Sequence, residues 1–296
     1  MIFLLVVSVV WAFSFPLIKL HLTTLDPNFV ALVRMVLALL VLLPFLRTRK
    51  IDPGLAIRLA AIGAMQMGVM YVTYIRSFQY LQSYEVALLT IMTPLWITLF
   101  SSVLSRFLAP RFQLAALLAI VGAAVIVWRH EALGPALTGV LLIQISNIAF
   151  GVGQLLYKRT MAAHPELKSH QVFALLYAGA VVVTLAATAV TFEPAQFKIT
   201  GTQMLVLVYL GIVASGIGFL LWNHGATKVS VGTLAVMNNG YMPLAVIAGL
   251  VWLGEGADPI RLAIGSGLIV GALFVTEKAG GVGAPARTPP SGDISP

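Results

Sequence analysis

The 296-residue sequence contains no cysteine, and Asp, Glu, Lys and Arg together make up only 9% of it. The lack of cysteine excludes disulfide bonds and thiolate metal sites. The lack of charge excludes an ordinary soluble domain, in which about 25% of the residues are charged. Enzyme motifs are also missing, because the chain has no GxSxG, no HExxH, no P-loop and no paired carboxylates at helical spacing. We therefore expect no enzymatic activity, no cofactor and no bound metal.

Apolar residues take the place of charge, at 59% of the chain and with a mean hydropathy of +0.98. Long apolar runs separated by Pro, Gly and charge clusters predict membrane-spanning helices of about 20 residues each. The formal net charge is +8, but the basic residues lie in short loops between the apolar runs. This placement indicates membrane topology. We expect membrane lipid and a small-molecule substrate as partners, and no nucleic acid.

One segment of the chain occurs twice, once in each half. It reads Thr93-Pro94-Leu95, Leu104, Pro110 and Ile120-Val121-Gly122-Ala123, and it recurs as Met242-Pro243-Leu244, Leu253, Pro259 and Ile269-Val270-Gly271-Ala272. The constant offset (243 − 94 = 149) indicates two homologous halves. Each half is long enough for about five spans, and an odd number places the second half upside down in the bilayer. Inverted repeats of this kind are typical of secondary transporters.

The apolar runs predict an all-α integral membrane protein with ten transmembrane helices. The expected spans cover residues 2–20, 29–46, 59–78, 85–104, 112–128, 137–157, 171–192, 204–222, 232–253 and 260–276. Residues 1–129 are predicted to form the first five-helix repeat, and residues 130–278 the second, inverted repeat. Residues 279–296 are rich in Gly, Pro, Ala and Ser, which predicts a disordered tail.

The basic residues predict the orientation of these helices. With the N-terminus in the cytoplasm, twelve Lys and Arg residues fall on the cytoplasmic side and six on the outer side. Basic loops are retained in the cytoplasm, so both termini and the tail are expected there. Omitting one helix would remove this bias, which favours the count of ten.

Polar residues inside the predicted spans form stripes at helical spacing. Lipid offers no hydrogen-bond partner, so such residues face protein or a water-filled cavity. Neutral polar groups from several helices, together with Tyr, Trp and Met, suit a cavity for an amphipathic organic solute. The predicted cavity residues are Trp11, Ser14, Gln66, Tyr71, Thr73, Tyr74, Ser77, Tyr80, Thr90, Asn147, Gln154, Ser215, Asn238, Asn239 and Tyr241. The alternative for each is an interhelical hydrogen bond that only holds the bundle together.

Three prolines, Pro16, Pro94 and Pro243, lie within predicted spans. We predict that they act as hinges for gating. Proline removes a helical hydrogen bond, so the symmetric pair Pro94 and Pro243 would also leave free carbonyls near the middle of the bilayer. The alternative is that these prolines are only structural kinks.

Ionisable residues are scarce within the spans. Glu85 is the only acid close to a span interior, at the outer mouth of the fourth helix, so no residue is a clear mid-membrane proton carrier. Arg34 and Arg76 lie toward the outer face. We favour snorkelling of both side chains to the headgroups over contact with a substrate carboxylate. Lys19, near the outer end of the first span, fits either an anchor or a site residue.

Short motifs in both halves carry a resemblance to a known family. The first span contains Val10-Trp11-Ala12-Phe13-Ser14-Phe15-Pro16-Leu17-Ile18-Lys19, and Arg34 follows in the second. Tyr80-Leu81-Gln82-Ser83 precedes Thr93-Pro94-Leu95, and the second half ends with Leu253-Gly254-Glu255, Gly265 and Gly271. In this order and spacing, over residues 5–277, the motifs resemble the EamA module of the drug/metabolite transporter superfamily. One departure is that Arg106 replaces, in the first half, the acid found at Glu255.

This resemblance implies ten helices, cytoplasmic termini and export of metabolites, amino acids or amphiphilic drugs by alternating access. It also implies a central cavity walled by the first four helices of each half. The Tyr-, Trp- and Met-lined cavity most resembles that of bacterial aromatic amino acid and methyl viologen exporters. We therefore expect a secondary transporter, acting as a monomer in the bacterial cytoplasmic (inner) membrane, that exports aromatic or other neutral amino acids. The rivals are a channel or uncoupled facilitator, a membrane enzyme or lipid-handling protein, and a structural membrane subunit.

Overall fold

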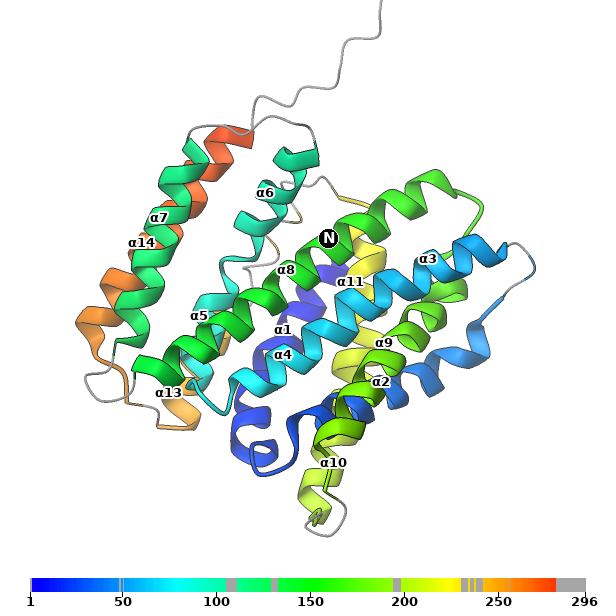
Figure 1. Cartoon of the computed structure of the whole chain (residues 1–296), viewed down its shortest axis with the longest axis horizontal. Helices are drawn as coiled ribbons and strands as arrows, with labels where there is room; N and C mark the ends of the chain where they lie inside the picture. Colours follow the sequence, from blue (N-terminus) through cyan, green and yellow to red (C-terminus); the bar gives the residue numbers. More distant parts are fainter. Residues whose placement is uncertain are drawn as a thin grey trace, which may run out of the picture.

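The computed structural model describes residues 2–47, 49, 51–104, 111–128, 133–193, 198–229, 234, 237, 242–254 and 256–280. Over these residues the chain is all-helical and has no strand (Figure 1). The first part of the chain forms α1 (Ile2–Leu17), η1 (Ile18–Leu22), α2 (Pro27–Leu42), η2 (Leu43–Phe45), α3 (Pro53–Gly63), η3 (Ala64–Val69), α4 (Met70–Ser77), α5 (Ser83–Thr90), α6 (Thr93–Leu104) and α7 (Arg111–Val127). The second part forms α8 (Leu133–Ala163), α9 (Ser169–Thr191), α10 (Gly201–Tyr209), η5 (Leu210–Ile217), α11 (Gly218–Thr227), α13 (Met242–Trp252) and α14 (Pro259–Gly280).

Six helical stretches of the described chain are long and apolar enough to cross a membrane. They are Ile2–Leu22, Pro27–Phe45, Pro53–Ser77, Gly134–Ala163, Ser169–Thr191 and Gly201–Thr227. Four shorter apolar helices cover Ser83–Ile97, Leu117–Ile126, Met242–Trp252 and Pro259–Ala272. Large apolar side chains lie on the outer surface, such as Ile120 and Phe274, each 62% exposed. Such a surface is unsuited to water and suited to lipid.

Side-chain caps begin several of these helices. Asp26 accepts a hydrogen bond from the backbone N–H of Phe29 at 2.7 Å, and Pro27 occupies the first turn of α2. This pairing of an acidic N-cap with proline is favourable, because proline lacks the N–H that would otherwise need a partner. Glu85 accepts from the backbone N–H of Gln82 at 2.7 Å in a capping box that begins α5. The acid closest to a span interior therefore has a structural role at a helix start.

Two spans are interrupted by π-helical segments in related places. In one, η3 separates α3 from α4, and in the other, η5 separates α10 from α11. The segments end at Val69 and Ile217, so they are 148 residues apart (217 − 69 = 148). A π-helical turn adds a residue to the ordinary helical turn and changes which residues share a face.

Two close helix crossings also lie at corresponding positions in the two parts of the chain. Gly63 packs against Leu176 of α9, and Gly211 packs against Leu37 of α2. The two glycines are 148 residues apart (211 − 63) and the two leucines 139 apart (176 − 37). The span α3–η3–α4 of the first part therefore packs on α9 of the second part, and the span α10–η5–α11 of the second part packs on α2 of the first.

The Gly63 crossing leaves no room for a side chain. A Cβ atom at Gly63 would lie 1.9 Å from the backbone oxygen of Leu176. We expect Gly63→Ala to lower the free energy of unfolding by about 1–3 kcal/mol, the usual cost of overpacking. Thermal unfolding of the detergent-solubilised protein measures this change. Gly271→Ala is the matched control, because no atom of another described segment lies within 4 Å of the Cβ position at that helical glycine. Equal stability of the two variants would contradict the crossing.

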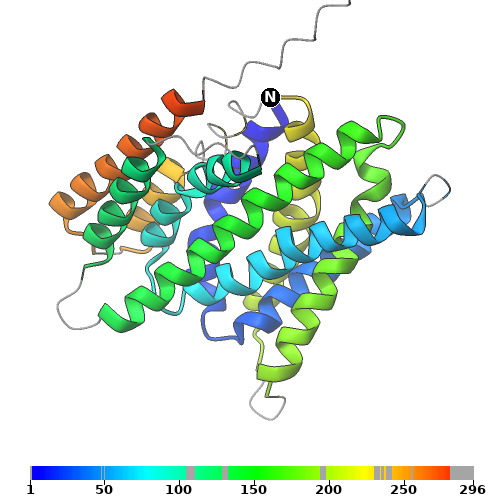
Figure 2. The ribbon, with the colours of Figure 1, turned by 45° about the horizontal axis from the view of Figure 1, so that its top comes forward.

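The helices α7 and α14 pack side by side at one end of the molecule (Figure 1). The second view shows them again as a pair, at the opposite end from α2, α9 and α10 (Figure 2). Gly122 and Gly265 allow their backbones to approach, since a Cβ atom at either would lie 2.8 Å from the other's carbonyl oxygen. The pair lies beside the bundle of α1, α2, α4, α8 and α11, and that bundle contains a pocket.

Candidate substrate pocket

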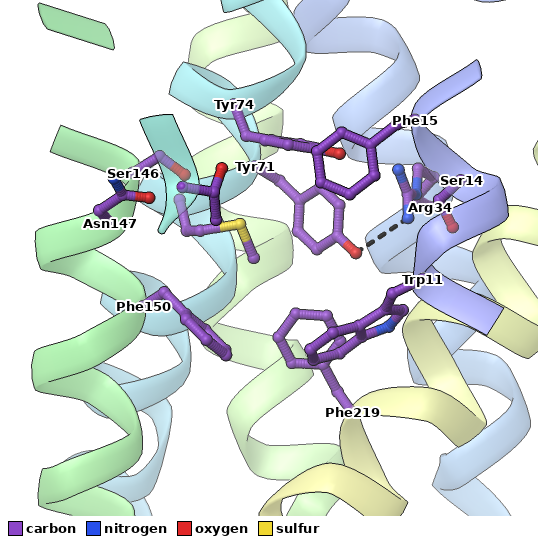
Figure 3. A pocket seen from close by; sticks show the side chains of 12 residues that line it. Trp11, Ser14, Phe15, Arg34, Tyr71, Tyr74, Ser146, Asn147, Phe150 and Phe219 are labelled. Atoms are coloured by element: carbon purple, nitrogen blue, oxygen red, sulfur yellow. Dashed lines mark hydrogen bonds between the residues drawn. The ribbon is translucent and has the colours of Figure 1, made fainter. Parts of the chain in front are cut away.

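A pocket lies inside the helix bundle, between helices from both parts of the chain (Figure 3). Its walls come from α1, α2, α4, α5, α8 and α11. The lining residues are Trp11, Ser14, Phe15, Arg34, Met70, Tyr71, Tyr74, Thr90, Ser146, Asn147, Phe150 and Phe219. Most of this lining is aromatic or apolar, with a few polar groups, which is the usual make-up of a small-molecule site.

Trp11 is the centre of the aromatic wall. Its ring centroid lies 4.9 Å from that of Phe219 and 6.0 Å from that of Phe150. The indole Nε1 donates to the backbone oxygen of Ala214 at 2.9 Å, which fixes the ring plane. Tyr71 continues the wall, with its ring centroid 5.8 Å from that of Phe219. The rings are held by one another and by a backbone bond, so the wall is largely preformed.

Arg34 supplies the only positive charge among the lining residues described. Its side chain is only 2% exposed. Nε donates to Ser215 Oγ at 3.1 Å and Nη2 donates to the Tyr71 hydroxyl at 2.9 Å. Nη1 has no hydrogen-bond partner within the described structure, and no carboxylate of that structure forms an ion pair with Arg34. A buried cation without a paired anion destabilises the folded protein, so this guanidinium is suited to bind an anionic ligand.

The favoured interpretation of Arg34 as a snorkelling residue is wrong. The side chain lies over the Tyr71 ring, with Cζ 4.3 Å from the centroid, and it is buried inside the bundle. The hydroxyl of Tyr177 supports the same cluster by donating to the Ser215 backbone oxygen at 2.7 Å. Arg76, by contrast, is half-buried and does not line the pocket.

Ser146 and Asn147 supply uncharged polar groups to the lining. Their side chains are 3% and 2% exposed. The Asn147 amide nitrogen donates to the backbone oxygen of Leu89 at 2.9 Å and to Gln144 Oε1 at 3.2 Å. These two acceptors determine which way the amide faces. Figure 3 shows Ser146 and Asn147 on the opposite side of the pocket from Arg34.

The predicted cavity residues divide into three groups. Six of them line the pocket: Trp11, Ser14, Tyr71, Tyr74, Thr90 and Asn147. Six lie outside its lining: Gln66, Thr73, Ser77, Tyr80, Gln154 and Ser215. Three lie outside the described residues: Asn238, Asn239 and Tyr241.

Interhelical bonding, the alternative for each polar residue, describes three of those outside the lining: Gln66, Gln154 and Ser215, whose hydroxyl accepts from Arg34 of α2. Gln66 Nε2 donates to Asn223 Oδ1 at 3.1 Å, and Gln154 Oε1 accepts from Trp222 Nε1 at 3.2 Å. Thr73 and Ser77 donate to carbonyls of their own helix, at Val69 and Tyr74 respectively. Tyr80 is half-buried in the turn after α4, while Ser215 contacts Arg34 from behind the pocket wall.

Sequence reasoning did not select Phe15, Ser146, Phe150 and Phe219, although all four line the pocket. Met70, which the sequence places on the polar stripe of the third span, also lines it. The internal repeat could have predicted two of these missed residues, Phe150 and Phe219. Phe150 follows Trp11 by 139 residues (150 − 11), and Phe219 follows Tyr71 by 148 (219 − 71). The same two offsets relate the glycine crossings. Alignment of the two halves helix by helix would therefore have found both rings.

The three prolines lie at helix irregularities. Pro16 is buried near the end of α1 and is followed by the π-helical turn η1. Pro94 and Pro243 are each the second residue of a helix, α6 and α13. Near Pro94 the Thr90 carbonyl accepts from the Thr93 hydroxyl at 2.8 Å, and the Leu89 carbonyl accepts from Asn147. These carbonyls are therefore satisfied by side chains, and the hinge role stays a prediction.

Two lysines make matching contacts in the two parts of the chain. Lys19 Nζ donates to the backbone oxygens of Phe78 and Leu81, both at 2.8 Å. Lys158 Nζ donates to those of Ala226 and Val229, at 2.8 and 2.7 Å. The lysines are 139 residues apart (158 − 19), and the carbonyls 148 apart (226 − 78 and 229 − 81). Lys19 thus ties η1, which continues α1, to the C-terminal end of α4, and Lys158 ties α8 to the C-terminal end of α11.

We expect Lys19→Met and Lys158→Met to destabilise the protein by similar amounts, about 1–3 kcal/mol each. The reason is that each substitution removes charged hydrogen bonds and leaves two helix-end carbonyls without their donor. Thermal unfolding in detergent measures both, with Lys198→Met at an exposed loop lysine as the control. A large effect of one variant and none of the other would show that the two contacts are not equivalent.

Over its described residues the chain is all-helical, with six membrane-length helices and an aromatic and polar pocket inside the bundle, which is the architecture of a membrane transporter. The sequence pattern of the EamA-like transporter family matches residues 1–128 and again residues 137–277. The chain belongs to the EamA-like transporter family, which confirms the resemblance found in its motifs. It is a multi-pass membrane transporter and not an enzyme.

Three named relatives illustrate what the chain is similar to. A "Probable biotin transporter" of Pseudomonas aeruginosa is 40% identical over 276 residues, which cover 92% of this chain and 96% of that protein. The "Biotin transporter" of Escherichia coli (strain K12) is 39% identical over 282 residues, covering 94% and 93% of the two chains. A "Probable terminal-alkyne amino-acid exporter" of Streptantibioticus cattleyicolor is 33% identical over only 82 residues, or 28% of each chain.

Proposed function

We propose that this protein carries biotin, or a close structural relative of biotin, across the membrane. The observation that carries the proposal is the buried, anion-free Arg34 on an aromatic pocket. Biotin joins a carboxylate through an apolar chain to an uncharged ring system, so it offers an anion for the guanidinium and apolar surface for the rings. The similarity over nearly the whole chain to proteins named biotin transporters supports the same substrate.

The chemistry of Arg34 favours a carboxylate. A guanidinium pairs with a carboxylate through two parallel hydrogen bonds, which are stronger than bonds between neutral groups. The Nη1 atom has no partner to give up before it meets a ligand oxygen. Tyr71 and Ser215 hold the other two nitrogens, so the group is oriented before the ligand arrives. Preorganisation of this kind reduces the cost of binding.

Amino acids, the substrates expected from the sequence, are the second candidate, and the short match to an amino-acid exporter favours them. An amino acid brings an ammonium group along with its carboxylate. Among the described lining residues there is no Asp or Glu to pair with that ammonium, and burying it unpaired is costly. Cationic drugs are less favoured still, because Arg34 repels a positive charge.

We also infer ten transmembrane helices in two inverted five-helix repeats, with both termini in the cytoplasm of a bacterial cell and a single chain as the transporting unit. The six long and four shorter apolar helices support the count. The paired π-helical segments, glycine crossings and lysine contacts support the internal symmetry. The two repeats would rock about the pocket, with Pro94 and Pro243 as hinges, to expose it to each side in turn.

Counterflow in proteoliposomes that contain only this chain tests the proposal. Vesicles preloaded with unlabelled biotin should accumulate labelled biotin transiently and with saturation, because a carrier exchanges its substrate across the membrane in both directions. Saturable counterflow of phenylalanine without counterflow of biotin would contradict biotin as the substrate and indicate an amino acid instead. Flux that neither saturates nor shows counterflow would indicate a channel, and no flux of any solute would favour a structural subunit.

A further inference from the structure

The polar pair of α8, Ser146 and Asn147, is not explained by packing alone. Both side chains are more than nine-tenths buried and both line the pocket. The Asn147 amide nitrogen is committed to Leu89 and Gln144. Its Oδ1 atom accepts no hydrogen bond from any described residue, and Ser146 Oγ likewise has no partner among them. Neither atom is among the fully enclosed unpaired atoms of the described structure, so both open onto the pocket and are available to a ligand.

The bonds of Asn147 leave its Oδ1 as a fixed acceptor. Both amide hydrogens are used, because one goes to the Leu89 carbonyl and the other to Gln144 Oε1. Gln144 is held in turn, since its Oε1 also accepts from Trp96 Nε1 at 2.8 Å. The adjacent Ser146 hydroxyl can donate as well as accept. Together they offer one acceptor and one donor, without charge, at one side of the pocket.

The charged and uncharged polar groups lie apart. Arg34 is on one side of the pocket and Ser146 and Asn147 are on the other, with Tyr71 between them and Trp11 and Phe219 along one edge (Figure 3). An elongated ligand with an anion at one end and an amide-like group at the other matches this order. Biotin has such a form, because its ureido ring carries N–H donors and a carbonyl acceptor at the end remote from the carboxylate.

We infer that Ser146 and Asn147 form the subsite that recognises the ureido ring, and so determine the orientation and the specificity of transport. A ureido N–H donates to Asn147 Oδ1, and Ser146 Oγ donates to the ureido carbonyl oxygen. The carboxylate then lies at Arg34. This assignment rests on the proposed function, since it presumes that a biotin-like carboxylate is the substrate.

Lipoate is the discriminating probe, because it has the same carboxylate chain as biotin and a ring that cannot form the ureido hydrogen bonds. The measurement is the inhibition constant of each compound in counterflow, expressed as the biotin-to-lipoate preference. The wild type should prefer biotin, and both Asn147→Leu and Ser146→Ala should reduce the preference by about 10-fold or more. A general loss of folding or activity lowers both affinities together, so it leaves the ratio unchanged.

Two further comparisons separate loss of the subsite from misfolding. Ser146→Ala leaves the structural bonds of Asn147 in place, so it tests the subsite even if Asn147→Leu folds poorly. Thr138→Val on the same helix removes an exposed hydroxyl bonded to the Gly134 carbonyl and should leave the ratio unchanged. Absence of biotin transport by the wild type would overturn the proposed function. Biotin transport with an unchanged ratio in both pocket variants would overturn only the subsite.

Discussion

Arg34→Met is expected to reduce the affinity for biotin by about 30-fold or more, because removing one partner of a buried ion pair costs roughly 2–5 kcal/mol. The loss should be seen in the inhibition constant for counterflow and in direct binding to the purified protein. Arg34→Lys should also bind poorly. An ammonium is a point charge, and it cannot hold Tyr71 and Ser215 while pairing with both carboxylate oxygens.

The same substitution should leave the fold intact, which separates a binding role from a structural one. Methionine removes an uncompensated buried charge, so the stability of the ligand-free protein should stay equal or rise. The groups left behind remain satisfied, since the Tyr71 hydroxyl and Ser215 Oγ lie 3.1 Å apart and bond to each other. Arg76→Met is the control, because that half-buried arginine lies outside the pocket lining.

An uncharged ligand makes the test specific to the carboxylate. Biotinamide lacks the anion and should bind the wild type weakly, with little further loss in Arg34→Met. If Arg34→Met weakens biotin and biotinamide by the same factor, the arginine shapes the pocket and does not pair with the carboxylate. Equal biotin affinity in Arg34→Met and the wild type would show that Arg34 does not contribute to biotin binding.

The long spans were predictable because they depend only on local composition. The second span, for instance, was expected over residues 29–46, and it is formed by α2 and η2, Pro27–Phe45. The polar stripe of the third span was harder to place, because its predicted face assumed a regular helix; it consists of Gln66, Met70, Thr73 and Ser77, flanked by Tyr71, Tyr74 and Tyr80. The π-helical segment η3 contains Gln66 and ends just before Met70. The extra residue of a π turn rotates the helix that continues beyond it, so Tyr71 and Tyr74 reach the pocket, whereas Gln66 does not.

The environment of Arg34 depends on partners that are distant in sequence. Tyr71 is 37 residues away and Ser215 is 181 residues away. Position along a span gives the depth of a residue in the bilayer, but the direction in which its side chain points depends on how the helices pack. A sequence without its fold therefore predicts an arginine near the outer face and leaves open whether lipid or protein surrounds it.

The pocket combines a symmetric aromatic wall with asymmetric polar groups. Trp11 and Phe150 occupy related positions, as do Tyr71 and Phe219. The position related to Arg34 is Phe173 (34 + 139 = 173), and the one related to Asn147 is Ser8 (147 − 139 = 8). Apolar walls of equal shape suit a carrier whose halves exchange conformations around one ligand. The polar groups, present once each, then determine which ligand is carried.

Trp11→Ala is expected to weaken biotin and lipoate by the same large factor, about 100-fold, since buried aromatic anchors dominate such sites. Trp11 contacts Phe219, Trp222 and Phe150 and is only 7% exposed, so its removal opens the wall along the apolar part of either ligand. The biotin-to-lipoate preference should therefore stay constant. This outcome is the opposite of that for Asn147→Leu, which changes the preference.

Because Trp→Ala in a core costs about 3–5 kcal/mol of stability, Trp11→Phe provides the milder test. It keeps an aromatic ring against Phe219 and loses only the bond from Nε1 to the Ala214 carbonyl. Its affinity for both ligands should fall by about 10-fold or less, in line with one hydrogen bond. Trp252→Ala is the control on the outer surface, where that ring is 62% exposed and stacks on Phe13. A change of preference in Trp11→Phe would assign Trp11 to recognition of the ring, and loss of binding in Trp252→Ala would show that general destabilisation, not the pocket, determines affinity.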